Sequence, residues 1–381
     1  MTLWVEDTAR NNLAAWTIDA YGAGLVTGAV LSPFSTPRVS NNYKQSAQQT
    51  AQRLAAEGID VWLDPETHAL QMPAVGDFRY YEGWPIWSGR RGVLDDTGDM
   101  RDHVERVFAE QDRLGVSHLA PTILLHSPQS QESQRALELT QVANEIDPAA
   151  RLAIAGDSAF WASTTGLNAH VGAVAQMEPP GWFLTVARPL TLLPVPAVAE
   201  EVHGLCRTAR ALSEDGDVHV SHGDLAGLPA IAAGGTTLGT GWDPRQRVCA
   251  YVSYEARGAG GDGGQWFQQA TLEGLLSLLV RSEALTLEAQ DAPLATRLLP
   301  GAVPPGPSEA FQHHADVLAR VVRNLAAKGP RDAFEDLTDR YDSARTDWTA
   351  SAAALGVPSR ANSWLTALAD GLTLYGRSEG F

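Results

Sequence analysis

The chain has 381 residues, of which 44% are hydrophobic and 19% charged, and its formal net charge is −17. This composition excludes a disordered chain and is typical of a folded globular protein. The length allows one large barrel with an extension, or two domains. The negative charge disfavours nucleic acid and anionic membranes as partners, because long-range attraction would be absent.

Cysteine usage and apolar runs indicate neither secretion nor a membrane. Cys206 and Cys249 are isolated, which predicts neither a disulfide framework nor a cysteine-rich zinc site. The opening segment MTLWVEDTARNN lacks the apolar core of a signal peptide. The most apolar helical stretch, LEGLLSLLVRSEAL, is interrupted by Glu273 and Arg281 and is too short to span a bilayer. We therefore expect a cytoplasmic protein.

Short apolar runs alternate with helical segments over residues 1–258. The predicted strands are 24–31, 59–65, 117–126, 151–157, 181–189, 217–224, 236–243 and 248–255. Helices are predicted between them, for example over 40–58 and 99–114. Such alternation indicates parallel pairing, and eight strands fit a (β/α)8 TIM-like barrel, an α/β fold. A doubly wound open sheet is the alternative, but it would place a glycine fingerprint after the first strand, where this chain has none.

The character of the chain changes after residue 258. GAGGDGG is typical of a flexible joint, and helices are predicted over 265–286, 309–328, 331–354 and 360–376. The chain is therefore divided into a barrel, 1–258, and a helical extension or subdomain, 259–381. The extension is the expected surface for a homo-oligomer.

In such barrels the chemistry lies at the carboxyl ends of the strands. The catalytic candidates at these positions are Asp64, Asp157, His222 and Asp224. Grouped carboxylates can divide into acid and base, and a histidine transfers protons near neutral pH. Structural alternatives stay open: Asp157 and Asp224 can cap helices, and Asp64 can initiate a turn before proline.

Further strand-end residues are candidates for binding. Arg188 is suited to an anion or a carboxylate, and Asp243 follows the strand 236–243. Glu255 ends the last predicted strand.

The loop 68–92 is unusually long for a connection in such a barrel. Its candidate substrate-binding residues are Phe78, Arg79, Tyr80 and Trp84, which suit a lid or a stacking platform. The alternative is a hydrophobic cluster that caps the barrel mouth.

The segment GGTTLGTG, 234–241, lies where many barrels bind phosphate through backbone N–H groups. Gly239, Gly241 and the following Trp242 are therefore binding candidates, although such glycines also serve close packing. His313 and His314 are adjacent on a predicted helix and do not share a face, which disfavours a metal site built from both. Schiff-base chemistry is disfavoured because neither Lys44 nor Lys328 lies at a strand end.

The order of features over 218–247 resembles that of the tRNA-guanine transglycosylase superfamily. The stretches that carry the resemblance are VHVSHGD, LAGLPAIAAGG, TTLGTGW and DPRQR, and AVLSPFSTPR with GIDVWLDPETH at the start. The resemblance implies a barrel with N-glycosidic or nucleobase chemistry. The superfamily's zinc motif is absent, and Gly239-Thr240-Gly241 stands where its nucleophilic aspartate would fall. A carboxylate nucleophile would then be Asp157, Asp224 or Asp243.

The leading hypothesis is a barrel enzyme acting on a small nucleobase-like or phosphorylated ligand, with no cofactor predicted. Asp157 or Asp224 would be nucleophile or base, His222 the acid–base partner, and the aromatic loop the lid. One alternative is a lyase that binds phosphate at GGTTLGTG. A divalent metal held by Asp64, Asp157 and His222 stays open. A non-catalytic scaffold is the third reading.

Overall fold

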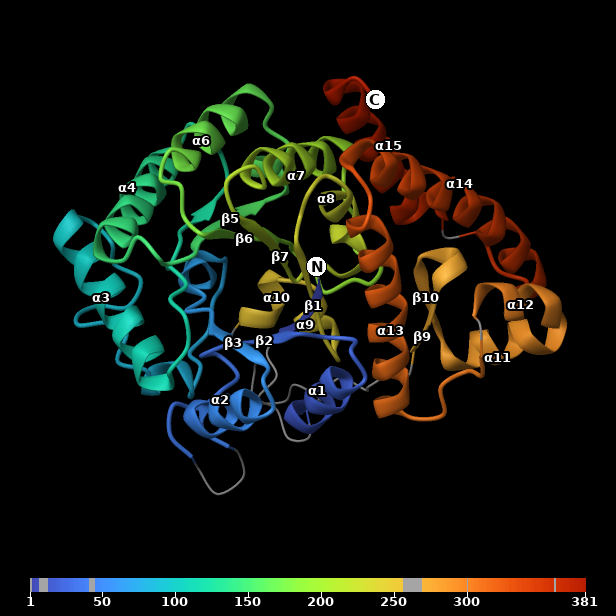
Figure 1. Cartoon of the computed structure of the whole chain (residues 1–381), viewed down its shortest axis with the longest axis horizontal. Coiled ribbons are helices and arrows are strands. Elements are labelled where there is room, and N and C mark those ends of the chain that lie inside the picture. Colours follow the sequence, from blue (N-terminus) through green and yellow to red (C-terminus); the bar gives the residue numbers. More distant parts are fainter. Residues whose placement is uncertain (1, 7–12, 41–44, 256–268, 300, 360) are drawn as a thin grey trace.

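The computed structural model describes residues 2–6, 13–40, 45–255, 269–299, 301–359 and 361–381. Within these ranges, eight parallel strands form one curled sheet in the order β3-β2-β1-β8-β7-β6-β5-β4 (Figure 1). The strands are β1 Thr2–Glu6, β2 Gly28–Leu31, β3 Asp60–Leu63, β4 Leu124–Leu125, β5 Leu152–Asp157, β6 Gly181–Ala187, β7 Asp217–Ser221 and β8 Thr237–Thr240. Because β1 pairs with both β2 and β8, the first and last strands meet, and the predicted (β/α)8 barrel is confirmed.

Helices surround the strands (Figure 1). Those between β1 and β8 are α1 Leu13–Gly22, α2 Ala47–Ala56, α3 Thr97–Leu114, α4 Gln131–Ile146, α5 Ser158–Trp161, α6 Thr165–Ala175, α7 Ala199–Leu212 and α8 Leu228–Ala232. The start of α2 shows how sequence fixes an element. The Ser46 hydroxyl accepts a hydrogen bond from the Gln49 N–H, and the Gln49 side chain accepts one from the Ser46 N–H. This capping box satisfies two N–H groups that a helix start leaves unpaired.

The ring of strands has a gap between β3 and β4, called the seam below, where no strand ladder is present in the described residues. Gln111 of α3 takes its place. Its side-chain amide donates to the carbonyl oxygens of Leu63 and Leu119, both at 2.9 Å, and its oxygen accepts from the Leu119 N–H at 3.2 Å. One buried side chain thereby satisfies backbone groups on both sides of the gap.

The barrel interior holds a layer of rings. Trp4 lies 4.1 Å from Trp62, centroid to centroid, and His219 stacks on Phe183 at 4.7 Å. A Cβ on Gly28 would lie 2.2 Å from the Trp4 ring, so only glycine fits there. Strand side chains alternate, so residues two positions further along also face the interior, closer to the mouth.

Within the barrel, several strands differ from prediction. The first strand of the barrel is β1, which was not among the predicted strands. The segment 248–255 was predicted as a strand and is not one. That segment contains α10, Tyr251–Tyr254, and makes only two isolated bridges, Ala250 to Arg188 and Glu255 to Val75. The predicted strand 117–126 is regular only at β4.

The C-terminal part adds helices and a hairpin. The predicted helix 265–286 is wrong in its described part, which holds β9 Gln269–Leu272, η4 Glu273–Leu275, β10 Ser277–Val280 and the start of α11. GAGGDGG lies outside the described residues. The further helices are α11 Arg281–Gln290, α12 Ala292–Leu298, α13 Pro307–Ala326, α14 Pro330–Leu355 and α15 Ala361–Glu379.

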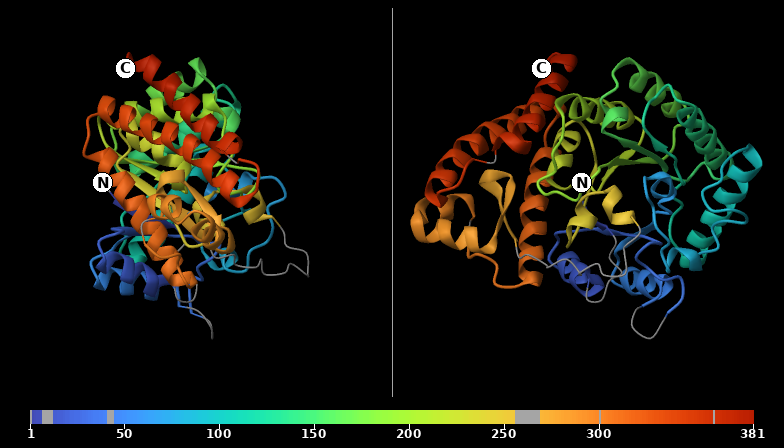
Figure 2. Two further views of the ribbon diagram at one scale, coloured as in Figure 1. Left: turned by 90° about the vertical axis from the view of Figure 1, so that its right-hand side faces the viewer. Right: turned by 180° about the vertical axis from the view of Figure 1, so that it is seen from behind.

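Helix α13 packs against β1, α1 and α8, and α15 packs along α7 (Figures 1 and 2). The outer flank of β1 is therefore covered by α13, in the position of the barrel's eighth helix. The division at residue 258 stays a prediction.

Candidate functional site

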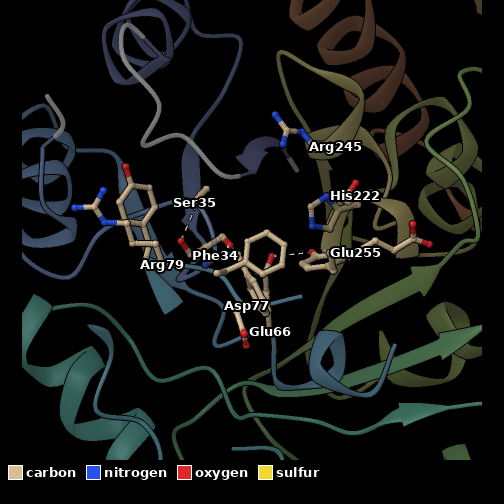
Figure 3. Close-up of a pocket in the computed structure, with 13 residues that line it drawn as sticks. Phe34, Ser35, Glu66, Asp77, Arg79, His222, Arg245 and Glu255 are labelled. Carbon is tan, nitrogen blue, oxygen red and sulfur yellow. Dashed lines mark hydrogen bonds between the residues drawn. The ribbon is translucent and has the colours of Figure 1, made fainter. Parts of the chain in front are cut away.

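A cavity of about 490 Å³ lies at the carboxyl end of the barrel. It is lined by Ser32, Phe34 and Ser35 after β2, Glu66 and 77–80 after β3, His222 after β7, Arg245 after β8, and Ser253, Tyr254 and Glu255. Figure 3 shows His222 and Arg245 on one side of it, with Phe34, Ser35 and Arg79 on the other.

Glu66 is a buried carboxylate of this cavity, with an exposed fraction of 4%. One of its oxygens accepts from the Ser32 hydroxyl at 2.6 Å, and the other from the Tyr254 hydroxyl at 3.1 Å. Because both oxygens accept hydrogen bonds, the arrangement favours the ionised carboxylate. The backbone of Glu66 is left-handed, with φ of 49°.

His222 is half-buried and also has a left-handed backbone, with φ of 50°. Its Nδ1 lies 2.9 Å from the carbonyl oxygen of Gln246. A carbonyl only accepts, so Nδ1 carries the proton, and a neutral His222 has its lone pair on Nε2. The backbone N–H of His222 donates to Glu6 at 3.2 Å.

The two residues share a conformation that L-amino acids rarely adopt. Left-handed non-glycine residues cost free energy and gather at functional sites. Here the two that line the cavity, Glu66 and His222, are both titratable. The fold therefore spends stability on placing a carboxylate and an imidazole at one cavity.

Below the cavity lies a pair of carboxyl groups with opposite pKa shifts. Burial raises the pKa of Asp64 to about 7, and nearby Glu6 adds to this, although the Glu66 N–H bonds to it. Burial also acts on Glu6, but His222 and His219 outweigh it and lower its pKa. At neutral pH, Glu6 is therefore ionised, whereas the protonated and ionised forms of Asp64 are present in comparable amounts. Such divergence is typical of acid and base assignments.

The mouth is crossed by the segment 249–255, called the crossing segment below. At one end the Arg188 N–H donates to Cys249 and the Tyr251 N–H donates to Arg188, both at 2.8 Å. At the other end the Gly76 N–H donates to Tyr254 at 2.8 Å. Since Arg188 follows β6 and Gly76 follows β3, this segment separates the side of β7, β8, β1 and β2 from the side of β4 and β5.

The aromatic loop is divided between the cavity and the core. Phe78, Arg79 and Tyr80 line the cavity, and Phe78 contacts Phe34 edge to face at 4.9 Å. Trp84 instead is buried, and its indole N–H donates to Thr36 at 3.0 Å. Short turns η1 Thr67–Gln71 and η2 Tyr81–Gly83 order this loop. Part of the loop therefore packs into the core, whereas the lid or stacking role of the cavity-lining residues stays a prediction.

Asp224 lies in a buried network beside the cavity wall, at the start of η3, Asp224–Gly227. Its carboxylate accepts from Thr240 at 2.7 Å, lies 3.0 Å from His314 Nε2 on α13, and lies 3.6 Å from Arg247. Despite burial, His314 and Arg247 lower its pKa. Burial and Arg247 lower the pKa of His314 to about 4. These contacts join α13 to the barrel and favour a structural role.

Of the other strand-end candidates, Glu255 lines the cavity, whereas Asp157, Arg188 and Asp243 do not. Asp157 accepts from two N–H groups of α5 and from His126. Arg188 forms a buried bidentate pair with Glu201 of α7, so a protein carboxylate is its partner. Asp243 accepts from the Arg245 N–H at 2.9 Å, at the start of α9, Pro244–Arg247.

The glycines of GGTTLGTG pack closely against side chains. A Cβ on Gly239 would lie 2.0 Å from a Glu6 oxygen, and one on Gly241 would lie 2.2 Å from Gln246. A carboxylate beside Gly239 disfavours a phosphate there. Trp242 is buried against Trp16 and Phe311.

The metal hypothesis finds no ligand cluster. In the described part of the chain, no group of three or more His, Cys, Asp or Glu residues could hold a metal ion. Asp64 follows β3 and Asp157 ends β5, two strands that are not neighbours in the sheet. Both cysteines are buried and unbridged, and burial raises the pKa of each.

Several residues of the site were not among the sequence candidates. Glu6 was missed because its strand was not recognised, although a carboxylate directly after LWV repeats the pattern of other strand ends. Glu66 was missed because it follows Asp64-Pro65, which was interpreted as a turn. Tyr254 was missed because it lies within the predicted strand 248–255. Ser253 also lines the cavity, and its buried hydroxyl has no hydrogen-bond partner in the part of the chain that the structure describes.

The chain matches no model of a known protein family and no curated protein. Among solved structures it is similar to a family 10 xylanase from Thermobacillus composti, with 12% identity, 58% of this chain and 67% of that chain covered, and a TM-score of 0.33. A D-allulose 3-epimerase from Methylomonas sp. has 11% identity, coverage of 62% and 84%, and a TM-score of 0.33. A probable tagatose 6-phosphate kinase from Sinorhizobium meliloti has 12% identity, 99% coverage of both chains, and a TM-score of 0.32.

Likenesses at this level assign neither family nor activity, and they give no support to the transglycosylase resemblance. Across the described helices, none combines the length and apolar character needed to cross a membrane.

Proposed function

We propose that the protein is an enzyme that performs carboxylate–histidine acid–base chemistry on a small polar ligand in the mouth cavity. The observation that carries the proposal is the pair of left-handed, titratable residues, Glu66 and His222, lining one cavity. Strained titratable residues in a concave site are candidates for catalysis.

The cavity lining fits a ligand with hydroxyl groups and a flat face. Glu66, Ser253 and Tyr254 offer hydrogen-bonding groups, while Phe34 and Phe78 offer apolar ring surface. Its formal charges nearly balance: the carboxylates of Glu66, Asp77 and Glu255 are opposed by Arg79 and Arg245. A neutral or singly anionic sugar-like or nucleoside-like molecule is the class that this combination suits.

The bond class we propose is glycosidic, as the transglycosylase resemblance also implies. Nε2 of His222 takes a proton from the attacking water, while the ionised Glu66 stabilises positive charge on the sugar carbon. The bond to the leaving group breaks with its electron pair, and the imidazolium returns the proton to that group. Water and glycoside thus give a free sugar and the protonated leaving group.

Release of product from p-nitrophenyl glycosides and from purine and pyrimidine nucleosides tests this proposal. We expect turnover by the full chain and a fall in kcat/KM of about 10²–10⁴-fold in both Glu66→Gln and His222→Gln, the usual contribution of an acid–base group. Tyr254→Phe, which removes one donor to Glu66, should lose far less.

Glu138→Gln is the matched control, since Glu138 is exposed on α4, away from the mouth. Circular dichroism and urea unfolding establish that each variant is folded. Absence of turnover by the wild-type chain on every glycoside and nucleoside would refute the bond class. Wild-type rates in both Glu66→Gln and His222→Gln would refute the site.

A further inference from the structure

The β4–β5 side of the crossing segment holds a second pair of titratable residues. His126 directly follows β4, and Asp157 is the last residue of β5, so both lie at the carboxyl ends of their strands. Neither lines the cavity described above. The crossing segment, held at β6 by Arg188 and beyond β3 by Gly76, lies between the two places.

The two side chains form an oriented dyad. His126 Nδ1 lies 2.6 Å from Asp157 Oδ2. The other oxygen of Asp157 accepts from the backbone N–H groups of Ala159 and Phe160, both at 3.0 Å, which fixes the carboxylate. The imidazole is therefore held by a rigid acceptor, while its side chain is 51% exposed. Since an ionised carboxylate only accepts, Nδ1 carries the proton and Nε2 carries the lone pair.

A second histidine–aspartate pair shows what a structural dyad looks like in this chain. His118 precedes β4, at the opposite end of the barrel, and bonds Asp147 through Nδ1 at 2.7 Å. Its Nε2 is bonded as well, to Asp112 at 3.0 Å, and its ring stacks on Phe108. Both nitrogens of His118 are occupied. In the described residues, His126 uses only Nδ1.

Tyr251 of the crossing segment adds a hydroxyl near the dyad. Burial and the nearby Asp157 raise the pKa of Tyr251 to about 12, so its phenol keeps its proton at neutral pH. The half-buried Tyr251 therefore brings a protonated phenol into the vicinity of Asp157.

We propose that His126 and Asp157 form a second proton-transfer site in the mouth, which acts on water or on a hydroxyl-bearing ligand. With an ester as the co-reactant, the O–H bond breaks, its proton passes to Nε2 of His126, and the oxygen's electron pair forms a bond to the acyl carbon. The bond from that carbon to the leaving oxygen breaks with its electron pair, and the imidazolium gives its proton to the leaving group or to solvent. Asp157 is the positioning residue: it fixes the tautomer and stabilises the imidazolium. This site is independent of the glycosidic chemistry assigned to Glu66 and His222.

Hydrolysis of p-nitrophenyl acetate by the full chain tests the proposal, with water as nucleophile. Loss of the base in His126→Gln should lower the rate about tenfold or more. Asp157→Asn still accepts the two α5 N–H groups but should lower the rate about three- to tenfold, because its amide no longer selects one tautomer. His118→Gln removes a matched imidazole at the other end of the barrel and should leave the rate unchanged.

The ¹⁵N chemical shifts of His126 give a readout that needs no turnover. We expect the protonated nitrogen to be Nδ1 in the wild type and the two tautomers to mix in Asp157→Asn. An Nε2–H tautomer in the wild type would overturn the proposal. So would a wild-type rate of acetate release in folded His126→Gln, or in folded Asp157→Asn.

Discussion

Two adjacent layers of the barrel interior have opposite character, although they lie on the same strands. Trp4 and Trp62 belong to the ring layer, whereas Glu6 and Asp64, two residues further along, belong to the layer below the cavity. Strand periodicity places all four side chains inside the barrel. The first layer gains stability by burying apolar surface, and the second buries carboxyl groups at a cost. A barrel can therefore stabilise one layer in order to tolerate a chemically poised one beside it.

Truncation of the ring layer should have the largest effect on stability. Trp62 contacts Trp4, Phe183 and His219, and the Arg151 guanidinium lies 4.6 Å from its ring. Trp62→Ala leaves a large void and should lower the free energy of unfolding by about 3–5 kcal/mol. Urea denaturation measures the difference. A loss below about 1 kcal/mol would mean that the layer is loosely packed, against the usual behaviour of buried aromatic residues.

Removal of the Gln111 side chain tests whether the stability of the barrel depends on the hydrogen bonds that bridge the seam. Gln111→Ala leaves the carbonyls of Leu63 and Leu119 without their side-chain donor. The free energy of unfolding should fall by about 1–3 kcal/mol, the usual cost of unpaired buried polar groups. Gln48→Ala serves as the control in the same urea titration, because Gln48 is an exposed glutamine of the helix α2. Equal stabilities for the two variants would contradict the role assigned to Gln111.

Neutralising Asp64 in the layer below the cavity should raise the free energy of unfolding, whereas the two preceding substitutions lower it. The pKa of Asp64 is about 7 in the folded chain and 3.8 for the free side chain, so the native state binds more protons between these values. The stability that protonation of Asp64 contributes to the folded chain is therefore present at low pH and is lost as pH rises through about 7. Asp64→Asn keeps an acceptor for the Glu66 N–H and removes this dependence.

Urea unfolding of the wild type and of Asp64→Asn from pH 4 to pH 8 measures the difference in their free energies of unfolding. We expect Asp64→Asn to gain stability over the wild type as pH increases. Parallel pH profiles for the two chains would show that Asp64 ionises normally and that the polar layer carries no such cost.

The fold was predictable because strand and helix signals alternate, but two segments misled the reading for physical reasons. TLWVE is short, lies in a polar surrounding, and gains its strand identity from pairing with β2 and β8. VCAYVSYE has strand periodicity, yet it spans the mouth, where it pairs only through isolated bridges to Arg188 and Val75. Tertiary context overrides local pattern in both cases.

The sequence identified cavity-lining residues where the inference depended on strand ends and loop composition, and it missed contacts that depend on packing. The strand-end rule brought forward His222, and loop length and composition brought forward Phe78, Arg79 and Tyr80, all of which line the cavity. No local pattern shows that Asp224 meets His314 from a helix ninety residues later, or that Asp157 orients His126. Such partnerships are set by how distant segments dock.

Closure of the ring through β1 has a consequence for biosynthesis. Thr2 pairs with Thr237, and α13, which ends at Ala326, covers the same strand. A nascent chain must therefore be extended through most of its length before its first strand acquires a neighbour on that side. Contacts so distant along the chain form slowly. Until they do, β1 is an unprotected edge that can pair with other chains, and rapid translation at high concentration should favour aggregation over folding.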